Sequence, residues 1–131
     1  MINLGKIISV LKKNKIEFIS GVPDSLFKDL CFKFEDLYKN NHIVAANEGS
    51  SIGLAIGYHL ATGKLPVIYL QNSGLGNTIN PLISLASSKV YKIPMILIIG
   101  WRGEVINKKQ IKDEPQHKEQ GIITLKLLKT M

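Results

Sequence analysis

Residues 66–77 read PVIYLQNSGLGN, and this stretch contains the change of pattern that indicates the fold. The apolar, β-branched and aromatic run Val67–Gln71 is typical of a buried strand. Small and polar residues at 72–77 then predict a loop, and the pattern beyond it predicts a helix over residues 78–88. A second apolar run, residues 95–99, predicts another strand. Strands joined by a helix on short loops indicate a parallel α/β sheet.

The rest of the chain repeats this alternation. The pattern predicts strands over residues 17–20 and 42–46, and helices over residues 4–14, 24–38, Glu48–Thr62 and from Pro115 onward. We therefore expect an α/β fold whose parallel sheet carries helices on both faces. Because residues 95–99 contain no polar residue, we expect this strand to be covered on both faces and to lie centrally in the sheet.

The composition describes a single globular domain spanning residues 1–131. The chain is 45% hydrophobic and 21% charged, with a formal net charge of +7, and it is long enough to bury a core of its own. The basic residues are spread along the sequence and Arg102 is the only arginine, which argues against a nucleic-acid-binding module. The longest apolar runs fall far short of the ~20 residues of a membrane-spanning helix, and Cys31 stands alone. We expect a cytoplasmic protein without disulfides.

The loop after the third predicted strand carries neutral hydrogen-bonding side chains. Ligands of parallel α/β sheets bind at the carboxyl ends of the strands, which places chemistry in residues 21–25, 47–50, 71–77 and 100–104. The third of these loops has no Gly-Lys-Ser/Thr ending, and Ile79 stands where a dinucleotide fingerprint needs glycine, which argues against a nucleotide. Its polar side chains suit a polar substrate, although ordinary turn chemistry explains them equally well.

Glu48 begins the helix after the second predicted strand, where the helix dipole favours a carboxylate. The same helix carries Gly49, Gly53 and Gly57 at every fourth position, and an interior glycine costs about 0.8–1 kcal/mol relative to alanine. Close approach of another backbone would compensate for this cost. Packing on the chain's own sheet is one explanation, and we favour the other, a subunit contact.

Two candidate site residues follow the fourth predicted strand. Arg102 comes just past the strand end and is a candidate anion clamp. His117 is a candidate acid–base residue, with simple solvent exposure as the alternative. The histidines show no metal-ligand spacing, and His42 and His59 are expected to be structural.

Taken together, a series of motifs runs in order along nearly the whole chain. They are GVPDS (21–25), ANEG (46–49), GYHLATG (57–63), QNSGLGN (71–77), GWRG (100–103) and DEPQH (113–117). This combination resembles the phosphonopyruvate decarboxylase family and its close relative sulfopyruvate decarboxylase, which depend on thiamine diphosphate. The resemblance implies the fold of the N-terminal pyrimidine-binding domain of these enzymes.

The resemblance also implies that part of such an enzyme is absent. Members of the family pair this domain with a second one, which holds the diphosphate and Mg²⁺ through a Gly-Asp-Gly motif that this sequence lacks. We expect residues 1–131 to supply only the pyrimidine-binding half of the cofactor site, with the metal ligands on the missing domain. The family continues into another strand after the last helix, so the last strand of the fold is also expected to be missing. We favour a fragment or truncated gene product over a natural short subunit.

The implied activity is decarboxylation of 3-phosphonopyruvate to phosphonoacetaldehyde and CO2 through a thiamine diphosphate ylide, within phosphonate metabolism. We expect a homo- or hetero-oligomer that is inactive without a diphosphate-binding domain or subunit. One alternative is the alpha subunit of a sulfopyruvate decarboxylase. An alternative of another class is a non-catalytic interaction domain that dimerises through the glycine-rich helix.

The resemblance assigns roles by position. Glu48 would activate the cofactor by hydrogen-bonding its aminopyrimidine ring, and Asp24 would lie on the substrate side and transfer a proton. The other cofactor contacts that it implies are Gln71, Asn72, Gly74 and Asn77. The other candidate substrate contacts are Ser25, Asn72, Ser73, Arg102 and His117, the last two binding the phosphonate or closing over the site.

Overall fold

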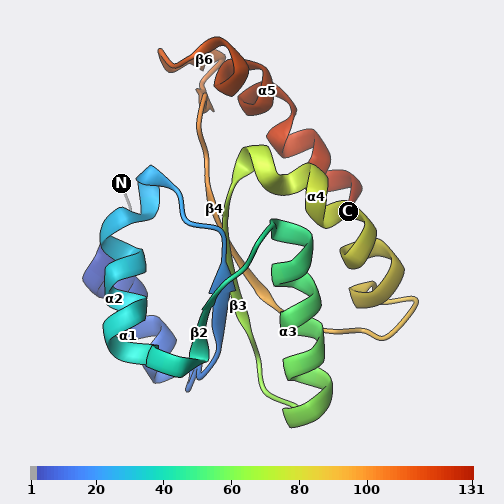
Figure 1. The fold of residues 1–131 in the computed structure, drawn as a ribbon. Coiled ribbons are helices and arrows are strands. Elements are labelled where there is room, and N and C mark those ends of the chain that lie inside the picture. The colour runs from blue at the N-terminus through green and yellow to red at the C-terminus, as the bar shows by residue number, and fades with distance from the viewer. Residues whose placement is uncertain (1–2) are drawn as a thin grey trace.

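A parallel sheet runs through the molecule, and helices cover both of its faces (Figure 1). The computed structural model describes residues 3–131. Its strands are β1 (Ile19–Gly21), β2 (His42–Val44), β3 (Val67–Gln71), β4 (Ile96–Gly100), β5 (Val105–Ile106) and β6 (Lys109–Gln110). Its helices are α1 (Leu4–Lys13), α2 (Lys28–Tyr38), α3 (Glu48–Thr62), α4 (Leu75–Pro81) and α5 (Pro115–Thr130). The predicted α/β class is confirmed.

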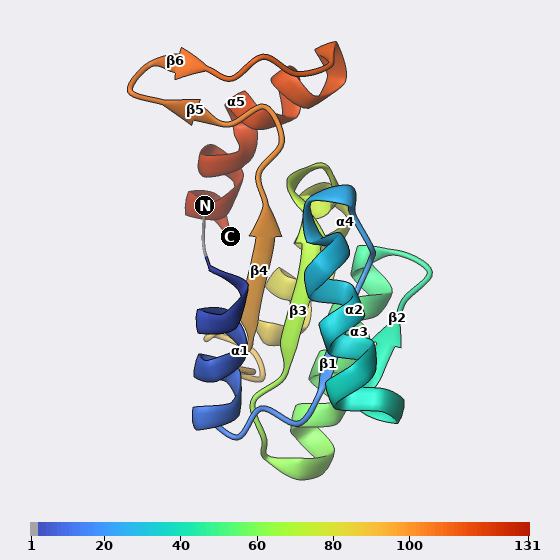
Figure 2. The ribbon, with the colours of Figure 1, turned by 90° about the vertical axis from the view of Figure 1, so that its left-hand side faces the viewer.

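The four longer strands are all parallel and lie in the order β2-β1-β3-β4. Helices α1 and α2 cover one face and α3 and α4 the other, and Figure 2 shows the strands side by side with α1 and α2 in front. The last residue of β3, Gln71, is paired in register with the last residue of β4, Gly100. The carboxyl ends of the strands therefore meet at one edge of the sheet.

The prediction that residues 95–99 form a central strand is wrong. β1 and β3 are the two interior strands, and residues Val67 to Leu70 of β3 have no exposed surface. Among the described residues β4 pairs only with β3, and Ile96 is 36% exposed. Both faces of β4 make apolar contacts, but the expected cover is only partial: Leu97, Ile98 and Ile99 are half-buried, and an open groove of about 390 Å³ lies between β4 and α1. An unbroken apolar run indicates apolar contacts on both faces of a strand, and it carries no information about the hydrogen-bonding edge.

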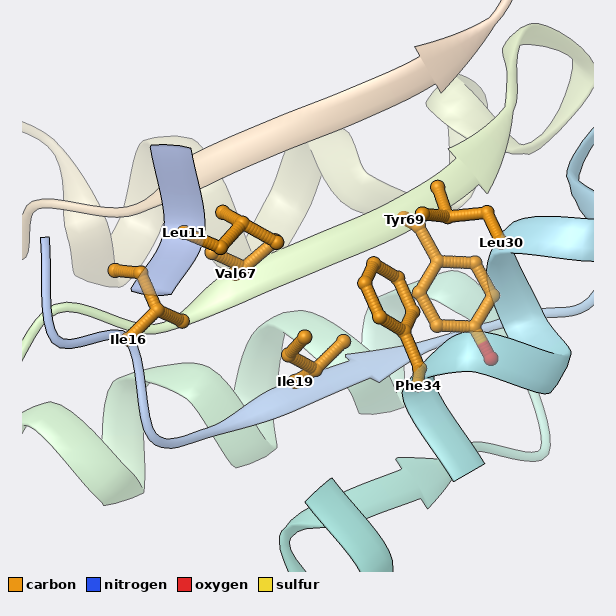
Figure 3. Close-up of a cluster of buried hydrophobic side chains, with 7 residues drawn as sticks. All are labelled: Leu11, Ile16, Ile19, Leu30, Phe34, Val67 and Tyr69. Carbon is orange, nitrogen blue, oxygen red and sulfur yellow. The ribbon is translucent and has the colours of Figure 1, made fainter. Parts of the chain in front are cut away.

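The core consists of two apolar clusters, one on each face of the sheet. Alternate side chains of β3 enter opposite clusters, because successive residues of a strand point to opposite faces. The first cluster joins α1 and α2 to β1 and β3 and contains Leu11, Ile16, Ile19, Leu30, Phe34, Val67 and Tyr69 (Figure 3). The second joins α3 and α4 to the sheet and contains Ile52, Ala55, Ile56, Ile68, Leu70, Leu75 and Ile93.

Local capping explains several helix boundaries. The side chain of Asn3 accepts a hydrogen bond from the Lys6 amide at 3.1 Å, and that of Asn47 accepts one from the Ser50 amide at 2.9 Å. Gly63 ends α3 in the left-handed conformation, with φ of +70°. The predicted helix Glu48–Thr62 and strand Val67–Gln71 are confirmed in their bounds.

Other boundaries differ by a few residues from the predicted ones. The helix predicted over residues 78–88 begins earlier, at Leu75, and after Pro81 it continues as a π-helical turn over Leu82–Ala86. A 3-10 turn, Ser25–Phe27, precedes α2 within the helix predicted over 24–38. Among residues 3–131, no helix combines the length and apolar character needed to cross a membrane.

A small hairpin and the last helix cap the carboxyl edge of the sheet. β5 and β6 pair antiparallel through Asn107 and Lys108, both of which have positive φ. A side chain at Gly121 of α5 would overlap the backbone of Gly103, so the two glycines allow α5 to touch the loop after β4 directly.

Candidate active site

The polar residues predicted for the site lie at the carboxyl edge of the sheet, where they form three separate clusters. Asp24 follows β1, Glu48 begins α3 after β2, and Gln71 ends β3. Arg102 lies just beyond β4. The three clusters differ in how fully their polar atoms are used within the chain, and this difference separates ligand-ready groups from structural ones.

The first cluster, here called the Glu48 cluster, consists of Glu48, Gly74 and Asn77. The half-buried Glu48 accepts a hydrogen bond at Oε2 from Asn77 Nδ2 at 2.7 Å. A side chain at Gly74 would overlap the Glu48 carboxylate, and a Cβ at Gly49 would lie 2.8 Å from the Asn77 carbonyl oxygen. Glycines at these positions therefore let the start of α3 dock on the start of α4. Within residues 3–131 no donor reaches Oε1 of Glu48, so this oxygen is available to a ligand.

The second cluster surrounds Asp24 and also contains Ser25, Gln71 and Ser73. Gln71 Nε2 donates to Asp24 Oδ1 at 3.1 Å, and the Ser25 hydroxyl donates to the same oxygen at 3.3 Å. The Ser73 hydroxyl donates to Gln71 Oε1 at 2.6 Å. The second oxygen of Asp24, Oδ2, is buried and has no hydrogen-bond partner. The structure thus brings together four of the residues predicted for the site.

The third cluster, here called the latch, is built around Asn72 and Arg102, with Asp113 and Thr124 as their partners. Asn72 is 1% exposed, and its amide donates to the Arg102 carbonyl at 3.0 Å and to Thr124 Oγ1 at 2.8 Å. Its Oδ1 accepts from the Arg102 amide at 3.0 Å. Both donor hydrogens of Asn72 are engaged inside the chain, so we assign this residue to the frame of the site rather than to ligand contact.

Arg102 is paired with Asp113 in the latch. Its Nε donates to Asp113 Oδ2 at 2.9 Å and its Nη2 to Oδ1 at 2.6 Å, which is a bidentate ion pair. The guanidinium holds the pKa of Asp113 well below its usual range, and the carboxylate in turn raises the pKa of Arg102. The predicted anion clamp therefore has much of its donor capacity already used by the chain itself.

Sequence reasoning missed Asp113 and Thr124 as partners in the latch. Asp113 belongs to the DEPQH motif given above. Because the chain has only one arginine, an ion pair between Arg102 and this carboxylate could have been predicted. Thr124 carries no such signal, because it reads as an interior residue of an amphipathic helix.

His117 lies in the first turn of α5, beside the loop after β4. Its Nδ1 is buried and has no hydrogen-bond partner. A side chain at Gly103 would overlap the His117 carbonyl, so the helix and the loop are in direct backbone contact. No hydrogen bond within residues 3–131 joins the ring to Asp24 or Glu48, and its role in acid–base chemistry stays a prediction.

The glycine row of α3 faces open space for part of its length. A Cβ at Gly53 or Gly57 would meet no atom within 4 Å, so packing on the chain's own sheet does not explain these two glycines. They line a broad open groove of about 730 Å³ whose walls are mostly apolar and include Val44, Leu54 and Tyr58. A subunit contact at these two positions stays a prediction.

The residues present suit an organic cofactor better than a metal ion. Oε1 of Glu48 packs against Gly74, where a side chain would overlap the carboxylate, and no donor within residues 3–131 uses it. An N–H of a heteroaromatic ring is a matching donor. Within the described part of the chain, no group of three His, Cys, Asp or Glu side chains is placed to hold a metal ion.

Comparison with known proteins connects this geometry to a family. The model of the thiamine pyrophosphate enzyme, N-terminal TPP binding domain, matches residues 5–124. Sulfopyruvate decarboxylase subunit alpha from Methanocaldococcus jannaschii is 40% identical over 105 residues, which is 80% of this chain and 59% of that protein. Phosphonopyruvate decarboxylase from Streptomyces viridochromogenes is 34% identical over 128 residues, which is 98% of this chain and 30% of that protein. The chain thus spans less than two thirds of these relatives.

A solved structure shows the same fold. The benzoylformate decarboxylase of Polynucleobacter necessarius superposes with a TM-score of 0.60 at 23% identity, covering 78% of this chain and 19% of that one. The family match extends over residues 5–124, which is most of the chain. This chain therefore belongs to the thiamine pyrophosphate enzymes, as an N-terminal thiamine-pyrophosphate-binding domain of that family.

Proposed function

We propose that this chain supplies the pyrimidine-binding half of a thiamine diphosphate-dependent decarboxylase that converts 3-phosphonopyruvate to phosphonoacetaldehyde and CO2. The observation that carries the proposal is the Glu48 carboxylate, which Asn77 holds by one oxygen while the other stays available above Gly74. A carboxylate placed in this way can exchange a proton with a nitrogen of a bound heterocycle.

The residues of the Glu48 cluster have distinct tasks in this proposal. When bound, thiamine diphosphate supplies the electron sink that loss of CO2 from a 2-oxo acid requires. Glu48 Oε1 would accept a hydrogen bond from the aminopyrimidine, and Asn77 would keep the carboxylate from rotating away. Gly74 allows the carboxylate to lie where a side chain would otherwise overlap it.

Asp24 handles the proton on the substrate side. Its Oδ1 accepts hydrogen bonds from Gln71 and Ser25, and its Oδ2 is buried without a partner. Ser25 and Ser73 add hydroxyl groups beside it. Arg102 and His117 lie on the anionic side of the substrate, with Arg102 contributing the donor capacity that Asp113 leaves unused.

The phosphonate is favoured because the phosphonopyruvate decarboxylase of S. viridochromogenes aligns with 98% of this chain. The second candidate is 3-sulfopyruvate, which the higher identity of 40% to the M. jannaschii alpha subunit supports. Both substrates are small 2-oxo acids with a compact anionic group, and both suit the same basic side chains.

A diphosphate-binding domain or subunit completes the proposed enzyme and holds Mg²⁺. The relatives that this chain matches are longer than the chain, and one of them is named as an alpha subunit. The open groove along α3 offers such a partner an apolar surface next to Glu48, because Ser50 and Gly53 of its lining belong to the same helix.

The test is CO2 release from 3-phosphonopyruvate and from 3-sulfopyruvate in the presence of thiamine diphosphate and Mg²⁺. The chain is assayed alone and mixed with a separately expressed diphosphate-binding domain of a family member. Turnover only in the mixture, abolished by Glu48→Gln and retained in the exposed-carboxylate control Glu119→Gln, supports the proposal. A folded chain that shows no turnover with either substrate in the mixture contradicts it and favours a non-catalytic interaction domain.

A further inference from the structure

We infer that Gln71 and Ser73 are positioning residues that hold the Asp24 carboxylate in one orientation. This inference deepens the proposed function and rests on it for its catalytic part. It departs from the prediction that both residues touch a ligand directly. The evidence is a chain of side-chain hydrogen bonds that runs from Ser73 through Gln71 to Asp24.

The Asp24 carboxylate and the Ser73 hydroxyl together hold the Gln71 amide in one orientation. A glutamine amide presents an acceptor at one end and donors at the other, and a half-turn of the group exchanges them. A serine hydroxyl can pair with either end, whereas a carboxylate oxygen only accepts, so Asp24 selects the Nε2 end. Ser73 Oγ donates to the other end, Oε1, at 2.6 Å and anchors it. Nε2 then donates to Asp24 Oδ1 at 3.1 Å.

This arrangement makes the two oxygens of Asp24 unequal. Oδ1 accepts from Gln71 Nε2 and from the Ser25 hydroxyl, whereas Oδ2 is buried without a partner. An unpaired buried carboxylate oxygen costs free energy unless it carries a proton or meets a donor from a ligand. The hydrogen bonds to Oδ1 are therefore what holds the carboxylate in this orientation, and Gln71 supplies the shorter of the two.

The surroundings of Oδ2 are closely packed. Gly100 lies beside Oδ2, and a Cβ at this position would be 3.0 Å from Oδ2 and 3.1 Å from the Phe27 ring. Gly100 is paired in register with Gln71 across β3 and β4. The same pair of strand ends thus places the donor for Oδ1 and the glycine against which Oδ2 packs.

The first experiment uses NMR spectroscopy on the full chain, so it does not depend on turnover. The side-chain amide protons of Gln71 are compared between the wild type, Asp24→Asn and Ser73→Ala. We expect the wild-type Gln71 protons to give two well-separated signals that shift in Asp24→Asn and lose their separation in Ser73→Ala. Ser73→Thr retains the hydroxyl and should restore them. Ser84→Ala is the matched control, because Ser84 Oγ donates to the Asn80 amide oxygen at 2.8 Å on an exposed helix surface.

The second experiment measures turnover in the mixture with the diphosphate-binding domain. For Ser73→Ala and Gln71→Met we expect kcat to fall about tenfold while KM changes less than about twofold, with Ser73→Thr close to the wild type. A direct contact of either residue with the substrate would instead raise KM.

The outcomes separate the inference from the proposed function. Gln71 signals that are unchanged in Asp24→Asn overturn the inference, and so does a rise in KM that matches the loss of kcat. Coupled Gln71 and Asp24 signals without turnover in any mixture leave the positioning in place and contradict the proposed decarboxylase.

Discussion

The latch and the Glu48 cluster occupy the same edge of the sheet, and their polar groups differ in availability. In the latch, Asn72 uses both donor hydrogens inside the chain and Arg102 is paired bidentately with Asp113. In the Glu48 cluster, Asn77 holds one carboxylate oxygen and the other is available. Polar residues that follow strand ends look alike in a sequence. Only their hydrogen-bond partners in the structure show which of them hold the chain together and which are available to a ligand.

The largest effect is expected in the latch. Asn72→Leu keeps the volume but leaves the Arg102 amide and carbonyl and the Thr124 hydroxyl without their partner, which should lower the free energy of unfolding by about 3 kcal/mol. Urea unfolding measures this change. The matched control is Asn77→Leu at the exposed asparagine of the Glu48 cluster, where we expect a change below about 0.5 kcal/mol. Equal losses in the two variants would remove the distinction between the clusters.

The second prediction concerns a variant that should lose activity but keep its stability. Glu48→Gln keeps an oxygen for the Asn77 hydrogen bond but removes the carboxylate, so turnover in the reconstituted mixture should fall by about 100-fold or more. The free energy of unfolding should change by less than about 0.5 kcal/mol. Turnover and urea unfolding are measured on the same preparations. A variant that loses stability in proportion to activity would show that Glu48 belongs to the frame.

The third prediction uses pH to test the latch. Because Arg102 holds the pKa of Asp113 below its ordinary value of 3.8, the folded chain binds this proton less tightly than the unfolded chain. The stabilisation is complete above pH 4 or so and is lost as the pH falls through the depressed folded value. Asp113→Asn should therefore unfold at a lower temperature than the wild type at pH 7, and the difference should shrink toward pH 2. A difference that stays constant over this range would mean that the ion pair does not stabilise the latch.

The smallest expected effect is a gain in the free energy of unfolding, where the latch variant is expected to show a loss. Gly53→Ala adds a methyl group to open space in the middle of α3, so the isolated chain should gain about 0.5–1 kcal/mol of unfolding free energy. Gly49→Ala is the control and should destabilise the chain, because its Cβ would lie 2.8 Å from the Asn77 carbonyl oxygen. If the α3 groove is a partner surface, Gly53→Ala should also weaken binding of the diphosphate-binding domain, which titration calorimetry measures.

Sequence reasoning predicted the fold class and most elements because these depend on local patterns. The run Val67–Gln71 and the helix Glu48–Thr62 were found with their observed bounds, since strand composition and a C-terminal glycine are local signals. The position of residues 95–99 at the centre of the sheet was predicted wrongly. A strand with apolar contacts on both faces has an apolar sequence, so these contacts can be predicted from it. Strand order depends instead on which elements lie alongside each other in space.

For the site, the sequence by itself determined which chemical groups reach the carboxyl edge, because parallel strands joined by helices end on one side of the sheet. Only the tertiary structure decided how each group is used. Asn72 and Asn77 belong to the same loop, yet one is buried among partners from α5 and the loop after β4, and the other is exposed beside Glu48. The physical reason is that these partners lie 30 to 52 residues away from Asn72 and 29 residues away from Asn77 along the chain, beyond the reach of any local pattern.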